Sequence, residues 1–251
     1  MRTYGLVGFP LEHSFSPDYF QQKFEKEGIA DCRYRLFPLK NIDALTQFFG
    51  RNPDVAGLNV TSPYKMSVIP FLDSLTAVAE AVGAVNTIAV RSVGGKRQLV
   101  GHNTDVAGFS ELLSSACPQL PGSALVLGSC GASRAVRHAL EKSGVRVQSV
   151  SRFFADNVLT YNDLSFDVIQ KNRLIINATP LGMVPYLGAK PELPYEALSS
   201  QHTLIDLIYN PEKTPFLKAG EERGASICNG LIMLHAQAEA SWRFWLSEPS
   251  A

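Results

Sequence analysis

A lysine and an aspartate stand out among the polar residues that follow apolar stretches of this chain. Lys65 ends the segment 59–65 (NVTSPYK), and Asp105 ends the segment 101–105 (GHNTD). A lysine and a carboxylate can share a proton, so the two residues are candidates for an acid/base pair. Each also has a structural interpretation, since Lys65 could be a solvated surface lysine and Asp105 could cap a helix that begins at Val106. Capping is compatible with catalysis, so both interpretations of Asp105 stay open.

Amide and hydroxyl side chains accompany this pair at the ends of strand-like runs. Asn59 and Thr61 alternate with Val60, so they would lie on one side of the chain. Asn86 ends a second apolar run, and residues 103–105 end a third. Open α/β sheets bind ligands beyond the carboxyl ends of their strands. These groups suit a small hydroxylated substrate, for which Asn59, Thr61 and Asn86 are candidate contacts.

A glycine-rich turn is the candidate nucleotide site. Residues 128–132 read Gly-Ser-Cys-Gly-Ala, and the apolar run 124–127 precedes them. In dinucleotide-binding loops the first Gly makes the turn and the second lets the pyrophosphate approach, while the helix N-terminus offers free N–H groups to the anion. Gly128 fills the first role, but Cys130 stands at the second position. The candidate cofactor contacts of this loop are Gly128, Ser129, Cys130, Gly131 and Ala132.

The end of the next strand-like run indicates which dinucleotide would bind. An acidic residue there suits the ribose hydroxyls of NAD, whereas an arginine suits the 2′-phosphate of NADP. After the run 145–150 the chain has Ser151 and Arg152, and no acid. Both residues are therefore candidate cofactor contacts that favour NADP. An ordinary turn with a solvated arginine would show the same residues.

The elements that must position these residues change in character after Thr104. Before it, strands are expected at 4–9, 32–39 and 56–60, a hairpin at 84–90 and 98–101, and helices from Ser16 as N-cap to 28 and at 44–49, 64–72 and 75–82. After it, strands are expected at 124–127, 145–150, 174–178, 203–207 and 225–228, and helices at 106–113, 133–142, 215–223 and 231–246. Alternating strands and helices with apolar strands predict a parallel sheet that is covered on both faces.

Length and composition limit the classes of function. The chain has 251 residues, of which 45% are hydrophobic, and no formal net charge. This predicts one large or two modest domains, a small-molecule ligand and no nucleic-acid surface, which would require a basic excess. No apolar run is long enough for a membrane span, and no apolar leader follows Arg2. The four cysteines form no Cys-x-x-Cys pair, so we expect no metal, no disulfide framework and a cytoplasmic protein. The pair His13-Ser14 does not indicate a serine hydrolase, because Gly-x-Ser-x-Gly is absent from the sequence.

Eight segments together resemble the shikimate dehydrogenase family, in the family's order and across nearly the whole chain. They are 8–17 (GFPLEHSFSP), 59–65, 83–87 (GAVNT), 101–105, 128–135 (GSCGASRA), 177–183 (NATPLGM), 206–211 (DLIYNP) and 230–237 (GLIMLHAQ). The resemblance implies reversible, NADPH-dependent reduction of 3-dehydroshikimate to shikimate, in the biosynthesis of chorismate and the aromatic amino acids. It also implies an α/β protein with an N-terminal substrate domain (residues 1–104 plus 231–251) and a Rossmann-like NADP domain (105–230), the C-terminal helix returning to the first domain.

The resemblance implies roles for individual residues as well. Lys65 and Asp105 match the family's catalytic pair. The positions that match substrate contacts are Ser14, Ser16, Asn59, Thr61, Asn86, Tyr209 and Gln237. Beyond the glycine-rich loop and the residues 151–152, the positions that match cofactor contacts are Thr179, Gly230 and Met233. Taken without the resemblance, Gln237 would be read as a polar helix residue and Tyr209 as a packed loop aromatic.

The chain departs from the family pattern at two places. Cys130 replaces the second Gly of the loop, so we expect somewhat weaker NADP binding. Phe153 follows Arg152 and Asp156 comes later, where the family often has a threonine and a second basic residue. Selectivity for NADP over NAD is therefore expected to be modest. Two alternatives stay open, a quinate/shikimate dehydrogenase that uses NAD and a non-catalytic regulator that binds a metabolite or nucleotide. Either a monomer or a homodimer is expected.

Overall fold

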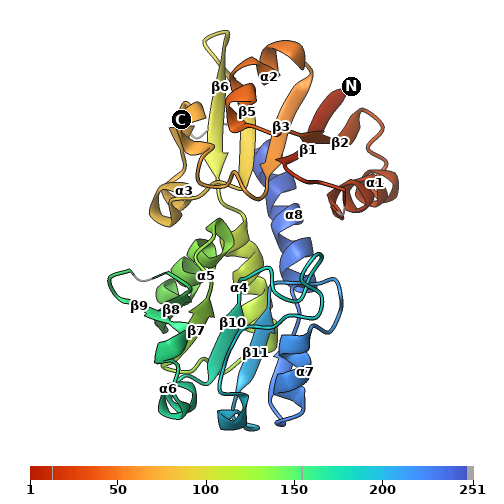
Figure 1. The fold of residues 1–251 in the computed structure, drawn as a ribbon. Coiled ribbons are helices and arrows are strands. Elements are labelled where there is room, and N and C mark those ends of the chain that lie inside the picture. Colours follow the sequence, from red (N-terminus) through yellow and green to blue (C-terminus); the bar gives the residue numbers. More distant parts are fainter. Residues whose placement is uncertain (13, 154, 248–251) are drawn as a thin grey trace. The chain divides into compact units, whose positions relative to one another are not determined.

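The structure is a computed structural model that describes residues 1–12, 14–153 and 155–247 (Figure 1). His13, considered above, lies outside the described residues. The chain divides into two compact units. Unit 1 contains Met1–Thr104 and the chain from Ala238 onward, and unit 2 contains Asp105–Gln237. Within the described residues each unit has one six-stranded sheet. The predicted α/β fold class is thus confirmed.

Unit 1 is built on a mixed sheet. Its strands are β1 (Arg2–Gly8), β2 (Cys32–Pro38), β3 (Val55–Val60), β4 (Ser74–Leu75), β5 (Thr87–Val93) and β6 (Lys96–His102), in the order β2-β1-β3-β5-β6-β4. Its helices are α1 (Ser16–Lys26), α2 (Leu45–Arg51), α3 (Ala77–Val82) and the second half of α8 (Leu231–Leu246). β1, β2 and β3 run parallel, whereas β5 is antiparallel to both β3 and β6. The predicted hairpin is the pair β5–β6.

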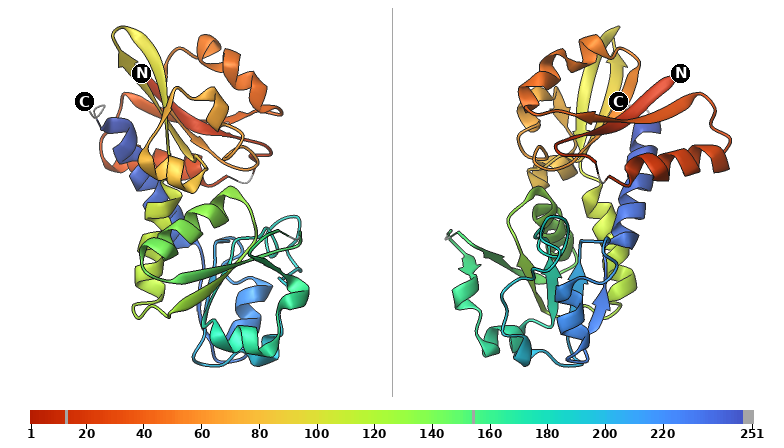
Figure 2. Two further views of the ribbon diagram at one scale, coloured as in Figure 1. Left: turned by 90° about the vertical axis from the view of Figure 1, so that its left-hand side faces the viewer. Right: turned by 45° about the vertical axis from the view of Figure 1, so that its right-hand side comes forward.

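Different helices cover the two faces of this sheet (Figure 2). On one face, α2 and α3 pack on β1 and β3, with Phe48 and Leu58 in the shared core. On the other face, α1 and α8 pack on β1 through an aromatic cluster. There the rings of Tyr4 and Trp245 stack with centroids 4.7 Å apart. Trp245 also lies directly on Gly57, where a Cβ would collide with its indole ring.

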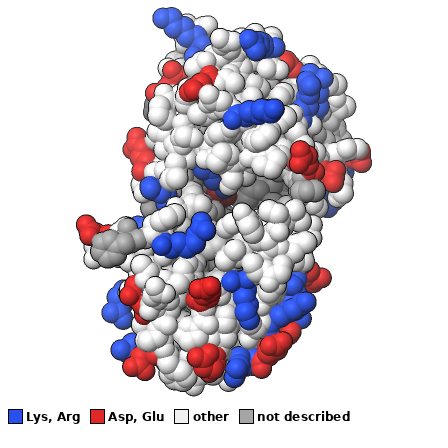
Figure 3. Space-filling view, viewed as in Figure 1, with Lys and Arg blue, Asp and Glu red and all other residues white. Residues whose placement is uncertain are grey.

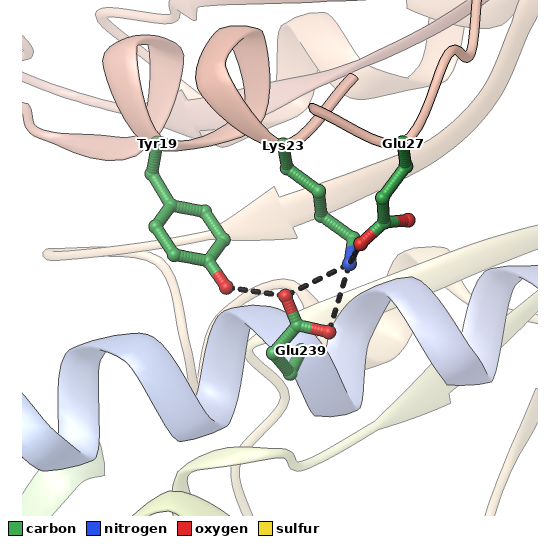
Figure 4. Close-up of polar contacts among 4 residues, drawn as sticks. All are labelled: Tyr19, Lys23, Glu27 and Glu239. Atoms are coloured by element: carbon green, nitrogen blue, oxygen red, sulfur yellow. Dashed lines mark hydrogen bonds and ion pairs between the residues drawn. The ribbon is translucent and has the colours of Figure 1, made fainter. Parts of the chain in front are cut away.

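A polar cluster joins α1 to α8 beside these aromatic contacts (Figure 4). The Tyr19 hydroxyl donates to the carboxylate of Glu239. The Lys23 ammonium lies 2.9 Å from Glu239 and 2.6 Å from Glu27. Its side chain is only 8% exposed, so two carboxylates compensate a largely desolvated charge. Burial, together with the hydrogen bond to Glu239, raises the pKa of Tyr19.

Unit 2 is a doubly wound parallel sheet. Its strands are β7 (Ser123–Leu127), β8 (Arg146–Ser151), β9 (Val158–Thr160), β10 (Leu174–Asn177), β11 (Thr203–Asp206) and β12 (Ser226–Cys228). All are parallel, in the order β12-β11-β10-β7-β8-β9. This is the strand order of the Rossmann fold, so the order reverses between β7 and β10.

Helices cover both faces of the second sheet, as the sequence pattern predicts. α4 (Asp105–Ala116) and α5 (Gly131–Lys142) cover one face together with the start of α8. α6 (Phe166–Lys171) and α7 (Pro215–Glu221) cover the other. Alternate residues of β7 face the two cores, Val126 with Leu140 on one side and Leu125 with Phe216 on the other. The central strands β7, β10 and β11 are buried on both faces, which explains why they are mostly apolar.

Two local predictions were wrong. The helix expected at 64–72 is replaced by turns and one short 3₁₀ helix, Ile69–Phe71. Pro70 explains this, because it lacks an N–H and disfavours helical backbone at the preceding residue. Ser16 is the first residue of α1 rather than its N-cap, which is Phe15, and the Ser14 hydroxyl accepts from the Ser16 N–H at 3.3 Å. The short elements β4, β9 and α6 were not predicted.

The surface and the helices add two observations. Figure 3 shows Lys and Arg interspersed with Asp and Glu on the visible face, in keeping with the zero formal net charge. Across the described part of the chain, no helix combines the length and the apolar character that crossing a bilayer requires. In the same residues, no cluster of three or more His, Cys, Asp and Glu side chains is arranged to hold a metal ion.

Candidate active site

The polar residues of unit 1 meet at one edge of its sheet. Asn59 is paired with Thr87 across β3 and β5, and Thr87 is paired with His102 across β5 and β6. The carboxyl ends of β3 and β6 therefore lie beside the start of β5. Asn86 lies just before that start, and its side-chain oxygen accepts from the backbone N–H of Thr104 at 2.7 Å. Three of the predicted segments are thus brought together, as the sequence indicated.

A buried hydroxyl at the centre of this edge was not predicted. Ser241 of α8 is completely buried, and its Oγ lies 2.9 Å from Asn59 Nδ2, 2.9 Å from Thr87 Oγ1 and 3.0 Å from Thr104 Oγ1. Asn59 also accepts from the Tyr34 hydroxyl at 2.9 Å. The amide hydrogens of Asn59 are therefore used inside the protein, and it can act on a ligand only through Oδ1 or through the network.

Backbone hydrogen bonds tie Lys65 to the same edge. Its carbonyl accepts from the N–H of Val85 at 2.7 Å, next to Asn86. The segment before it is held by Thr61, whose N–H donates to Val7 at 2.9 Å, and by Tyr64, whose hydroxyl donates to the Leu39 carbonyl at 2.6 Å. Lys65 itself is half-buried. These hydrogen bonds fix the backbone from which the Lys65 side chain extends.

Asp105 follows Thr104 directly and is the first residue of α4. The residue is only 4% exposed, so its carboxylate is not solvated. Buried carboxylates are rare unless a partner compensates the charge.

The serines at the start of α1 connect to the same network. Ser14 and Ser16 are both half-buried. Burial raises the pKa of Tyr34, and a hydrogen bond with Ser16 opposes the shift. Tyr34 in turn donates to Asn59 at the centre of the polar edge.

The glycine-rich turn of unit 2 lies where the strand order reverses. Gly128 follows β7 with φ +110°, a conformation that side chains rarely adopt, and a Cβ there would press on Ala178 and Thr179 after β10. Cys130 is the N-cap of α5, with extended backbone and no side-chain cap. Its exposed thiol lies 3.4 Å from the carbonyl of Ala178. The first N–H groups of α5 are left for an anion, so the loop fits a dinucleotide pyrophosphate despite its substitution.

Ser151 and Arg152 end β8, the strand beside β7. Ser151 is buried, and its hydroxyl accepts from the N–H of Phe153 at 3.2 Å. Arg152 is exposed, with its guanidinium 5.8 Å from the centre of the Phe153 ring. This distance is within the range of a cation–π contact between neighbouring side chains.

The remaining candidates lie in the loops after β10 and β11 and at the start of α8. The Thr179 hydroxyl donates to Asn177 at 2.6 Å, and Tyr209 is half-buried in the loop after β11. Gly230 lies so close to Leu207 that a Cβ would collide with its carbonyl. Met233 is buried in the core that α4 and α5 share with the sheet. Gln237 is half-buried, and its amide donates to Leu234 at 2.9 Å.

Comparison with known proteins decides the family. Residues 6–88 match the family model described as the shikimate dehydrogenase substrate binding domain. A shikimate dehydrogenase (NADP(+)) from Desulforamulus reducens is 38% identical over 263 aligned residues, which cover 96% of this chain and 88% of the relative. The chain belongs to the shikimate dehydrogenase family.

Solved structures of the family agree in fold. The shikimate 5-dehydrogenase from Thermus thermophilus, in complex with NADP(H) and shikimate, has a TM-score of 0.83 and 31% identity, covering 98% of this chain and 94% of that one. A quinate dehydrogenase from Corynebacterium glutamicum, in complex with NAD, has a TM-score of 0.85 and 27% identity, covering 98% and 93%. Both cofactors therefore occur on this shikimate dehydrogenase scaffold.

Proposed function

We propose that this chain catalyses the reversible, NADPH-dependent reduction of 3-dehydroshikimate to shikimate. The observation that carries the proposal is the position of Asn86. The side-chain oxygen of Asn86 accepts from the N–H of Thr104, which directly precedes Asp105. The N–H of its neighbour Val85 donates to the carbonyl of Lys65. Backbone hydrogen bonds thus tie Lys65 and the residue before Asp105 to two consecutive residues, Val85 and Asn86.

The chemistry follows from these residue types. When bound, NADPH supplies the hydride that reduces the substrate ketone. The ketone oxygen gains negative charge as its carbon becomes tetrahedral, and Lys65 donates a proton from Nζ to that oxygen. Asp105 orients the ammonium group and shares its proton. In the reverse direction Lys65 accepts the proton of the shikimate hydroxyl.

Other residues bind and orient the ligands in this proposal. Hydroxyl and amide groups hold the substrate's hydroxyls and carboxylate, and they come from Ser14, Ser16, Asn59, Thr61, Asn86, Tyr209 and Gln237. The N-terminus of α5 holds the pyrophosphate of the cofactor, and Arg152 holds the 2′-phosphate. Residues 1–104 plus 231–251 would serve as the substrate domain and residues 105–230 as the cofactor domain.

One assay tests the proposal against its alternatives. Purified protein is supplied with shikimate or quinate and with NADP⁺ or NAD⁺, and the absorbance of the reduced nicotinamide is followed. We expect the highest kcat/KM for shikimate with NADP⁺. Preference for quinate with NAD⁺ would identify a quinate dehydrogenase, as in the Corynebacterium glutamicum relative. If neither NADP⁺ nor NAD⁺ is reduced with either substrate, the alternative of a non-catalytic regulator would be supported.

A further inference from the structure

Asp206 is a buried carboxylate to which the proposed mechanism assigns no role. It is the last residue of β11 and is completely buried. Its register partner on β10 is Asn177, the last residue of that strand. The two side chains thus meet at the carboxyl ends of neighbouring parallel strands, where such sheets bind their ligands.

One oxygen of Asp206 fixes the amide of Asn177. Asn177 Nδ2 donates to Asp206 Oδ1 at 3.0 Å, and also to the Leu181 carbonyl at 3.2 Å. An ionised carboxylate can only accept, so Asn177 must turn its NH₂ toward Asp206. Asn177 Oδ1 therefore faces the other way and accepts from both the N–H and the hydroxyl of Thr179, at 3.0 Å and 2.6 Å.

The same carboxylate fixes the loop that follows β11. Oδ1 accepts from the N–H of Ile208 at 3.0 Å, and Oδ2 accepts from the hydroxyl of Thr214 at 2.6 Å. These two partners enclose the stretch that carries Tyr209. Thr214 is also the N-cap of α7, whose position is thereby tied to the same loop.

We propose that Asp206 is a positioning residue that holds the cofactor-side loop, through Asn177 and Thr179, and the Tyr209 loop in one hydrogen-bonded arrangement. This inference rests on the proposed function, because Thr179 and Tyr209 are ligand contacts only there.

The same hydrogen bonds determine what the Thr179 hydroxyl can offer a ligand. Its hydroxyl hydrogen is committed to Asn177 and one lone pair accepts from the Leu181 N–H at 3.3 Å. Thr179 can therefore offer the cofactor an acceptor but no donor, which suits an amide N–H or a ribose hydroxyl.

Four variants separate positioning from simple stabilisation. Asp206→Ala removes the acceptor for both loops. Asn177→Ala breaks the link to Thr179 and the bond to the Leu181 carbonyl but leaves Ile208 and Thr214 bonded to Asp206. Thr214→Val removes the bond to Asp206 Oδ2 and the N-cap of α7 but leaves Asn177 and Ile208 bonded to Asp206, so it serves as the destabilised control for NADP⁺ binding. Asp206→Asn is the conservative rescue, because its oxygen still accepts from Asn177 and Ile208 while its NH₂ donates to Thr214.

The readouts are calorimetric binding of NADP⁺, calorimetric binding of shikimate, and hydrogen exchange of residues 178–182 and 207–214. Asp206→Ala should weaken binding of both ligands about fivefold, the equivalent of about one lost hydrogen bond each. Asn177→Ala should weaken only NADP⁺ binding. Thr214→Val should lower the melting temperature yet keep NADP⁺ affinity within about twofold of wild type. Asp206→Asn should also keep NADP⁺ affinity within about twofold of wild type.

Outcomes distinguish this inference from the proposed function. If the wild type oxidises shikimate but Asn177→Ala and Asp206→Ala bind NADP⁺ normally, the role of Asp206 is overturned. Equal loss of NADP⁺ affinity in Thr214→Val and Asp206→Ala would likewise reduce Asp206 to a stabilising residue. If Asp206→Ala does not fold, the comparison of Asn177→Ala with Thr214→Val decides. A wild type without turnover, whose two loops still gain exchange in Asp206→Ala, would refute the proposed function and keep the positioning role.

Discussion

Replacing Asp206 by asparagine should change how the stability of the protein depends on pH. Burial raises the pKa of Asp206 from 3.8 to about 6, and the hydrogen bonds from Thr214, Ile208 and Asn177 oppose this shift only in part. A raised pKa means that the folded state binds the proton more tightly than the unfolded state. The stabilising contribution of the protonated carboxyl is complete below about pH 4 and is lost as the pH rises through about 6. The amide of the Asp206→Asn variant would carry no charge at any of these pH values.

The magnitude follows from the size of the shift. A change from 3.8 to about 6 is about 2 pKa units, and at about 1.4 kcal/mol per unit this amounts to about 3 kcal/mol. The free energy of unfolding of Asp206→Asn, relative to wild type, should therefore rise by up to about 3 kcal/mol between about pH 4 and about pH 7.5. Most of the rise should fall between about pH 4 and about pH 6.

Urea unfolding followed by circular dichroism, at a series of pH values, measures this difference. Comparison with wild type cancels the titration of the other groups. Asp167→Asn is the matched control, because Asp167 is an exposed carboxylate in the same unit, and its difference from wild type should stay nearly constant. A stability difference for Asp206→Asn that does not change with pH would show that the carboxyl is not desolvated as the structure indicates.

Three further substitutions test other parts of the structure. Lys65→Ala should lower kcat far more than it changes KM for shikimate in steady-state assays, and turnover close to wild type would refute its role as proton donor. Cys130→Gly should tighten calorimetric NADP⁺ binding, because it removes a side chain from the turn before α5; equal or weaker binding would mean that the thiol is neutral or useful. Gly230→Ala should cost about 1–3 kcal/mol and lower the melting temperature, since its Cβ would collide with the Leu207 carbonyl. An unchanged melting temperature would contradict that close approach.

The sequence predicted the parts of the fold in which apolar residues recur at a regular spacing. α8 was predicted with its observed bounds, and the alternation after Thr104 correctly indicated a parallel sheet with two covered faces. The stretch 64–72 failed because its apolar residues resemble a helix face, while Pro70 prevents the helix. There the apolar residues Tyr64 and Val68 pack into the core of unit 1 from turns.

The sequence predicted those site residues that are brought together by the direction of the strands alone. Asn59, Asn86 and Thr104 end or precede strands of one sheet, so their convergence follows from topology. Ser241 and Tyr34 gave no such signal, because a serine in a long helix and a tyrosine in a strand are ordinary residues. Asp206 lies in one of the family segments, but the sequence did not predict a role for it. Its partners Asn177 and Thr214 are brought to it by the register of β10 with β11 and by the loop after β11, neither of which can be read from the sequence.

The division of α8 between the units has a consequence for folding while the protein is being synthesised. The core of unit 1 contains Trp242 and Trp245, and its polar edge contains Ser241, so the first 104 residues lack central parts of their own interior. Unit 2 is continuous from Asp105 to Gln237 and holds all of its sheet. During translation the segment that emerges first must therefore wait for the whole of unit 2 before its core can close, and its apolar sheet face is the surface that needs protection in the meantime.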